Sequence, residues 1–106
     1  MERHQRQAVE FARSILQGEL GIIAGCRKLS KLGHDLVEDC RVDPDFVVFV
    51  SVESETDHLP LEDQQALWNP AAFEEKQREV ARFEESARVD VLSACRSLIA
   101  RFDEST

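Results

Sequence analysis

The stretch that decides the fold runs over residues 42–52, Val42-Asp43-Pro44-Asp45-Phe46-Val47-Val48-Phe49-Val50-Ser51-Val52. Its composition is typical of a strand, because valine and phenylalanine are enriched in extended backbone. Its beginning is typical of a helix. Asp43 is a good N-cap, Pro44 suits the first helical position, and Asp45 places an acid in the first turn.

Two valines beside the cap also favour a helix. Val42 and Val47 have the spacing of a hydrophobic staple, in which the residue before the N-cap packs on a residue of the first turn. A cap and a staple specify a geometry, whereas burial easily overrides strand propensity. We therefore predict a buried helix over about residues 44–56, and with it an all-α protein.

Upstream of this helix, apolar residues recur at helical spacing over residues 2–17 and over about residues 20–32. Gly18 lies where a glycine commonly closes a helix. Gly21 and Gly25 reduce helix propensity in the second segment, but they would let another helix approach closely. Because the connection is so short, we expect the two helices to form an antiparallel hairpin.

Downstream, the run Trp68-Asn69-Pro70 repeats the start signal, with asparagine as N-cap and proline in the first helical position. The tryptophan precedes Phe73 at the spacing of a staple. No glycine or proline follows this run. We predict one long helix over about residues 70–103, or two nearly collinear helices. Its first half has few apolar anchors, so we expect that half to be partly exposed or packed on a second copy of the protein.

Together these elements predict a small all-α helical bundle with an N-terminal helical hairpin and a long C-terminal helix. A chain of 106 residues can hold one core, so we expect residues 1–106 to form a single helical domain. The composition, 42% apolar and 32% charged, excludes collagen-like, low-complexity and broadly disordered proteins.

Acidic residues are concentrated in the middle of the chain, whose formal net charge is −8. Residues 35–63 contain a single base, Arg41, and ten acids: Asp35, Glu38, Asp39, Asp43, Asp45, Glu53, Glu55, Asp57, Glu62 and Asp63. They form either a solvated face, partly covered by the bases of the first helix, or a surface complementary to a basic partner.

The same composition argues against several classes of partner. Nucleic-acid affinity comes mostly from clustered Lys and Arg, so a net acidic chain favours neither DNA nor RNA. The longest uninterrupted apolar run, residues 46–50, is far shorter than the ~20 residues that cross a bilayer. The charged N-terminal residues lack the pattern of a signal peptide. We expect a cytoplasmic protein that binds no membrane.

Three cysteines, Cys26, Cys40 and Cys95, are widely spaced and form no CxxC pair. We expect them to be reduced thiols. Cys26 and Cys95 fall on apolar helical faces, where cysteine behaves as a small buried hydrophobe.

Catalytic and metal chemistry have little support in the sequence. Asp43, Asp45, Glu53 and Asp57 could together hold a divalent cation, but they match no EF-hand loop. The histidines have no metal-ligand spacing with cysteine, and no Cys/His pair is suggested locally. The chain contains no GxSxG, P-loop or GxGxxG motif. We predict no catalytic residue, no metal site and no cofactor; a metal-dependent enzyme that uses these four carboxylates is the least favoured alternative.

Several runs carry a resemblance to a known family: Gly25-Cys26-Arg27-Lys28-Leu29, Asp43-Pro44-Asp45-Phe46, Ser54-Glu55-Thr56-Asp57-His58-Leu59-Pro60 and Ala94-Cys95-Arg96-Ser97-Leu98-Ile99, together with Trp68. The chain resembles a family of small bacterial proteins catalogued as a domain of unknown function. The resemblance covers most of the chain and implies no reaction. In size and acidity the chain is also similar in type to immunity proteins, which neutralise toxins in bacterial competition.

We therefore predict a non-enzymatic protein-binding module, of the immunity or antitoxin type, that presents an acidic surface to a basic protein such as a nuclease toxin. The predicted partner-binding residues are Glu53, Glu55, Asp57, Glu62 and Asp63. The main alternative is a homo-oligomeric structural protein, such as a homodimer, that pairs through the first half of the long helix.

Overall fold

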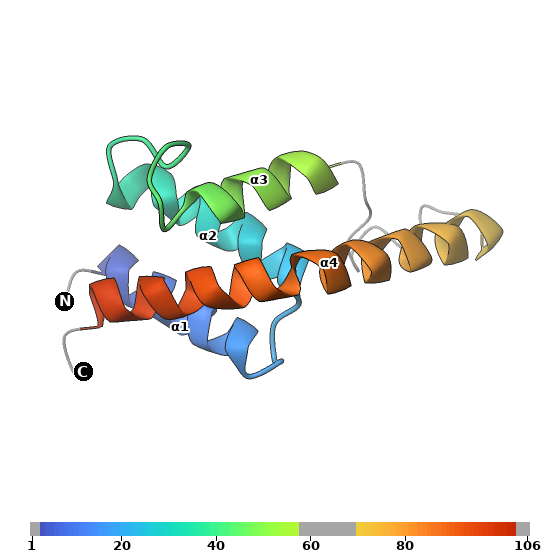
Figure 1. Cartoon of the computed structure of the whole chain (residues 1–106), viewed down its shortest axis with the longest axis horizontal. Coiled ribbons are helices and arrows are strands. Elements are labelled where there is room, and N and C mark those ends of the chain that lie inside the picture. Colours follow the sequence, from blue (N-terminus) through green and yellow to red (C-terminus); the bar gives the residue numbers. More distant parts are fainter. Residues whose placement is uncertain (1–2, 58–69, 104–106) are drawn as a thin grey trace.

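The computed structural model describes residues 3–57 and 70–103. Within these residues the chain forms four helices, and they contain no strand. The helices are α1 (Arg3–Leu16), α2 (Ile22–Leu36), α3 (Val47–Thr56) and α4 (Pro70–Phe102). The predicted all-α bundle, the N-terminal hairpin and the long C-terminal helix are confirmed (Figure 1).

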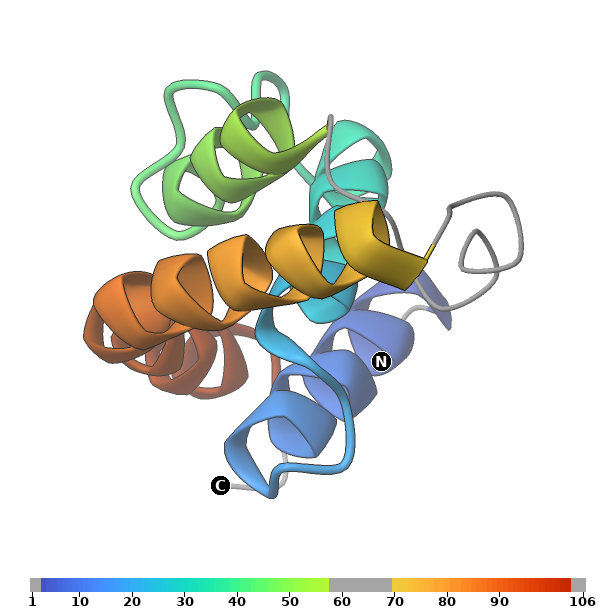
Figure 2. The same cartoon turned by 90° about the vertical axis from the view of Figure 1, so that its right-hand side faces the viewer.

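The helices pack as two pairs joined by the hairpin. Helices α1 and α2 run antiparallel, α4 packs mainly on α1, and α3 packs mainly on α2 (Figure 1). Helices α3 and α4 share few contacts, as do α2 and α4 (Figure 2). The N-terminal half of α4 extends beyond the ends of the other three helices (Figure 1).

The core receives apolar side chains from all four helices and from the loop before α3. Phe46 of that loop is fully buried. Its ring meets the ring of Phe49 edge-on at 6.2 Å between centroids, and it lies 6.3 Å from the ring of Phe102 at the end of α4. Phe46 therefore joins the start of α3 to the end of α4.

Helix α1 ends as its sequence predicts. Gly18 has a φ of +79°, a conformation that glycine adopts without the steric cost of a Cβ atom. Its N–H donates to the carbonyl of Ile15 at 3.1 Å, and the N–H of Glu19 donates to the carbonyl of Ser14 at 2.9 Å. This pair of bonds is a Schellman motif, which satisfies carbonyls at the helix end and turns the chain into α2.

Helix α2 is longer than predicted, because Gly33 does not end it. A Cβ at this buried position would lie 2.9 Å from both the Cβ of Cys40 and the ring of Phe46. Glycine therefore stays inside the helix to let the following loop pack against it. The predicted close approach at Gly25 is confirmed, since a Cβ there would lie 2.4 Å from the end of the Ile15 side chain in α1.

The start of α3 differs in part from the prediction. Regular helix begins at Val47, but Asp43 does cap the preceding turn: its Oδ1 accepts a hydrogen bond from the N–H of Asp45 at 2.9 Å. Its carbonyl also accepts from the N–H of Val47 at 2.9 Å. The predicted staple is wrong. Val42 is 75% exposed, because a turn in which its N–H bonds to Asp39 precedes the cap.

Replacing Gly33 by alanine tests the close packing of the loop on α2. We expect Gly33→Ala to lower the free energy of unfolding by about 1–3 kcal/mol, because Cys40 and Phe46 must move to admit a methyl group. Urea unfolding followed by circular dichroism measures this change. Gly21→Ala is the control, since a Cβ there meets only Glu84 at an ordinary 3.7 Å. Equal stability of Gly33→Ala and wild type would contradict the tight contact.

Candidate functional site

Helix α3 carries two of the predicted acids, Glu53 and Glu55, with Asp57 at its C-cap, and it has an apolar surface that the bundle covers only in part. Phe49, Val52 and Thr56 are buried. Val47 is 37% exposed, and Val48 is half-buried. The prediction of a buried helix is therefore wrong for one of its faces, because α3 packs mainly on α2 and makes few contacts with α4.

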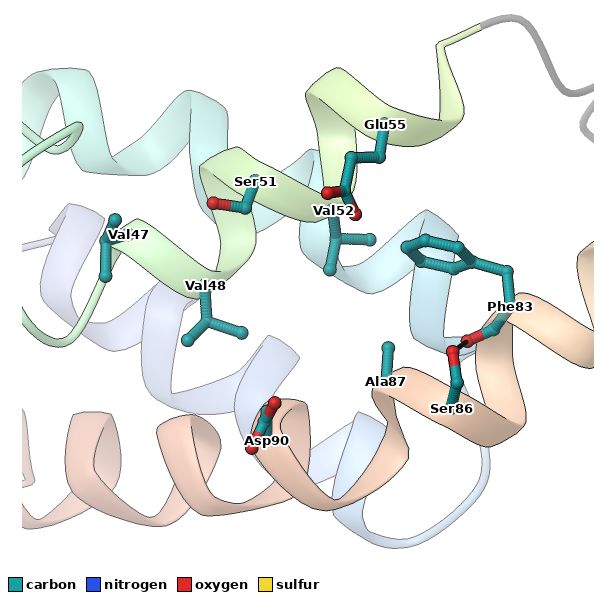
Figure 3. A pocket seen from close by; sticks show the side chains of 9 residues that line it. All are labelled: Val47, Val48, Ser51, Val52, Glu55, Phe83, Ser86, Ala87 and Asp90. Atoms are coloured by element: carbon teal, nitrogen blue, oxygen red, sulfur yellow. Dashed lines mark hydrogen bonds between the residues drawn. The ribbon is translucent and has the colours of Figure 1, made fainter.

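A groove of about 280 Å³ lies between α3 and α4, and we call it the α3–α4 groove. Val48 and Val52 approach it from α3, while Phe83 and Ala87 approach it from α4 (Figure 3). The nine described lining residues are Val47, Val48, Ser51, Val52, Glu55, Phe83, Ser86, Ala87 and Asp90. The groove is thus mainly apolar, with four polar side chains.

Two carboxylates lie at this groove, Glu55 from α3 and Asp90 from α4 (Figure 3). Both residues are exposed, and within the described part of the chain neither forms an ion pair or a side-chain hydrogen bond. Ser86 is engaged locally, since its hydroxyl donates to the carbonyl of Phe83 at 3.0 Å. The two acids are therefore available to a cation from outside the described residues.

The remaining predicted acids lie elsewhere. Glu53 and Asp57 line a second, more open groove of about 500 Å³ between α2 and α3, together with Arg27, Lys28 and Lys31. The bases beside Glu53 and Asp57 thus come from α2 rather than from the first helix. Glu55 lies on the other side of α3, in the α3–α4 groove. Glu62 and Asp63 lie outside the described residues.

Arg27 connects the second groove to the end of α3. Its guanidinium donates to the carbonyl of Thr56, the last residue of that helix. The hydroxyl of Thr56 donates to the carbonyl of Val52 at 2.5 Å. A cation at a helix C-terminus satisfies an open carbonyl and opposes the negative end of the helix dipole. No local sequence signal indicated this contact, because the partners are 29 residues apart.

Asp43 and Asp45, two of the four carboxylates considered for a metal, bind Arg101 of α4. The guanidinium lies 2.9 and 3.0 Å from the two carboxylate oxygens of Asp43 and 2.9 Å from Asp45 Oδ2. Among residues 3–57 and 70–103, no group of three or more His, Cys, Asp or Glu is placed to hold a metal ion. The geometry assigns these two acids to an ion pair between α4 and the loop before α3, which we call the Arg101 clamp.

The clamp changes the acidity of Asp43. Burial by itself would raise the pKa of this carboxyl group, but the hydrogen bonds from Arg101 and from the N–H of Asp45 outweigh it. The net effect lowers the pKa of Asp43 below its ordinary value of 3.8. Asp43 is therefore ionised over nearly the whole range in which the protein would be folded, and it stabilises the fold as an anion.

The cysteines are free and buried, as predicted for Cys26 and Cys95. Burial raises the pKa of Cys26 to about 12 and that of Cys95 to about 12, and it also raises the pKa of Cys40. The Sγ of Cys40 lies 3.6 Å from Nδ1 of His34, a pairing that the sequence analysis missed. All three thiols remain protonated near neutral pH, and none of them is activated as a nucleophile.

Comparison with known proteins adds no assignment: no protein-family model, curated protein or solved structure matches the chain. None of the helices in the described ranges combines the length and the apolar character that crossing a bilayer requires.

The Arg101 clamp predicts a specific pH dependence. Because the pKa of Asp43 is lower in the folded state, its stabilising effect is present above pH ~4 and is lost as the pH falls through the folded-state pKa. Replacing Arg101 removes this effect. We expect Arg101→Gln to lower the free energy of unfolding by about 0.5–1 kcal/mol near neutral pH, since the guanidinium is partly exposed and screened.

Urea unfolding of wild type and variant at several pH values measures this difference, which should shrink toward zero as the pH falls through the lowered pKa of Asp43. Arg96→Gln is the control, because Arg96 is exposed on the same helix. If the difference in free energy of unfolding between wild type and Arg101→Gln stays constant with pH, Arg101 acts by packing and not through the Asp43 carboxylate.

Proposed function

We propose that the protein is a non-enzymatic binding protein that presents the acids of α3 and of the following residues to a basic protein partner, in the manner of an immunity protein or antitoxin. One observation carries the proposal. Glu53, Glu55 and Asp57 have no ion-pair partner within the described part of the chain.

Other acids of the same segment are already paired within the fold. Arg41 binds Asp39, and Arg101 binds Asp43 and Asp45. Glu55 differs from these because nothing in the described fold uses its charge, whereas Glu53 and Asp57 line a groove together with Arg27, Lys28 and Lys31 without forming an ion pair. Unpaired like charges repel one another, and the bases of a partner would relieve that repulsion.

A basic partner is also favoured by kinetics. A surface of one sign of charge steers an oppositely charged protein and raises the association rate. The proposed binding set remains Glu53, Glu55, Asp57, Glu62 and Asp63. We place the protein in the cytoplasm, where its three free cysteines would stay reduced.

Charge reversal on α3 tests the proposal. A triple variant, Glu53→Lys, Glu55→Lys and Asp57→Lys, is compared with wild type in affinity capture from cell lysate at low salt, followed by mass spectrometry. We expect wild type to retain a basic protein that the variant loses. Circular dichroism checks the fold of the variant, because reversing Glu53 and Asp57 places like charges beside the bases of α2.

The matched control changes the net charge by the same amount on exposed residues of α4, through Glu74→Lys, Glu75→Lys and Glu85→Lys. This control should retain the partner. Retention by the α3 variant, equal loss by the control variant, or capture of no basic protein would each contradict the proposed function.

A second candidate function is homo-oligomerisation through the N-terminal half of α4. This half extends beyond the other helices (Figure 1), and it contains Phe73 and Val80 among mostly charged or polar side chains. Both apolar residues are half-buried, and Val80 packs against the protein's own core, so Phe73 is the apolar residue that this candidate depends on. Apolar side chains on a projecting helix are typical of a surface that pairs with another chain.

Light scattering distinguishes the two candidates. A monomer has a mass of 12.1 kDa, whereas a homodimer would have about twice that mass. If α4 mediates pairing, Phe73→Asp should convert the dimer to monomer. A mass of 12.1 kDa at the highest attainable concentration would remove this candidate.

A further inference from the structure

The apolar character of α3 exceeds what the bundle covers. A helix that is apolar on nearly all sides is normally buried on all sides. Phe49 and Val52 are buried, but Val47 and Val48 line the α3–α4 groove and remain partly exposed. The opposite wall does not cover them, because α4 presents the small residues Ser86 and Ala87 there.

The groove has the dimensions of a helix-binding site. Its lining residues span residues 47–55 on α3 and residues 83–90 on α4, which is about two turns or ~12 Å of each helix. The two helices run antiparallel (Figure 1), and their side chains form the two walls (Figure 3). An incoming helix with apolar anchors at i, i+4 and i+7 covers about the same length.

The charges at the groove select the kind of helix. Glu55 and Asp90 lie on opposite walls, and none of the nine described lining residues is basic. A neutral or acidic helix in the groove would take water from both carboxylates without supplying a counter-charge, which is costly. Lysine and arginine can bury their aliphatic stems on the valines while the charged group reaches a carboxylate.

Among the described helices, a second copy of the chain offers none that is both basic and free to expose its apolar side chains. The projecting part of α4, residues 70–82, contains three acids and three bases and is therefore not basic. Helix α1 is basic and amphipathic, but its apolar side chains, Ala8, Val9, Ala12 and Ile15, are buried in its own core. The occupant therefore belongs to a different protein. This agrees with the basic partner of the proposed function, on which the present step rests.

We infer that the α3–α4 groove binds a basic amphipathic helix of the partner. Apolar side chains of that helix pack between Val48 and Phe83, and its lysine or arginine side chains pair with Glu55 and Asp90. The inference gives the proposed function a docking site and a recognition mode. Direct contacts of Glu53 and Asp57 with the partner are then secondary, because these acids lie beside the bases of α2.

A designed peptide tests the groove without knowledge of the natural partner. The probe is a labelled amphipathic peptide of about 16 residues, with leucines at helical spacing and lysines beside them. Ala87→Phe fills the groove and changes no charge. We expect this variant to bind the peptide at least about tenfold more weakly than wild type in fluorescence anisotropy, which corresponds to ~1.4 kcal/mol.

Ala81→Phe is the matched control, because Ala81 is exposed on the same helix and does not line the groove. It should bind the peptide as wild type does, within about twofold. Circular dichroism checks the fold of both variants. If Ala87→Phe does not fold, Ser51→Phe narrows the groove from the other wall, where the side chain is exposed.

The carboxylates are tested separately with isosteric amides. Glu55→Gln together with Asp90→Asn should weaken peptide binding at low salt and reduce its salt dependence, whereas Glu74→Gln together with Glu85→Gln should have little effect. A second peptide with glutamate in place of lysine should bind poorly. Equal binding of the two peptides would overturn the charge selection.

The groove is excluded as the site if Ala87→Phe binds the lysine peptide as tightly as wild type does, or if wild type does not bind it. A doubling of protein mass that Ala87→Phe abolishes would show that a second copy occupies the groove, which overturns the inferred partner. Failure of the groove can be distinguished from failure of the proposed function. A natural basic partner that the α3 charge-reversal variant loses and Ala87→Phe retains supports the proposed function and overturns the groove.

Discussion

The packing of Phe46 is the contact on which the arrangement of α2, α3 and α4 depends. Its ring contacts the surface that Gly33 leaves open on α2, meets Phe49 in α3, and lies close to Phe102 at the end of α4. An aromatic ring that is fully buried among three helices fixes their relative positions, because protein interiors are close-packed and cannot adjust without opening voids. The Arg101 clamp also joins α4 to the loop before α3. Its residues Asp45 and Arg101 directly precede Phe46 and Phe102 in the sequence.

The docking groove follows from this arrangement. Helix α3 is held at its start by Phe46 and at its end by Arg27, and both contacts draw it onto α2. Helix α4 is held by α1 along its C-terminal half. The two helices therefore meet near one end of the bundle and leave a gap farther along, where Ala87 and Ser86 are too small to fill it. Part of an apolar helix thus remains accessible.

The structure also divides the acidic residues by role. Asp39, Asp43 and Asp45 are used locally, in ion pairs and caps that shape the loop before α3. Asp103 is buried and paired with Arg13, which ties the end of α4 to α1. Glu55 and Asp90 are different, because they flank an apolar groove without a cation among the described residues. Net charge alone did not separate these groups, since it counts every acid equally.

The sequence by itself determined the helical class, the closure of α1 at Gly18 and the cap at Asp43, whereas the predicted cap and staple at Asn69 and Trp68 lie outside the described residues. Each depends on residues within a few positions of one another, so local backbone geometry and capping decide it. Tertiary structure alone decided that α2 continues through Gly33, that Arg101 binds acids 58 and 56 residues away, and that Glu55 and Asp90 share a groove. These features depend on which helices pack together, and packing is set by side-chain shape across the whole core.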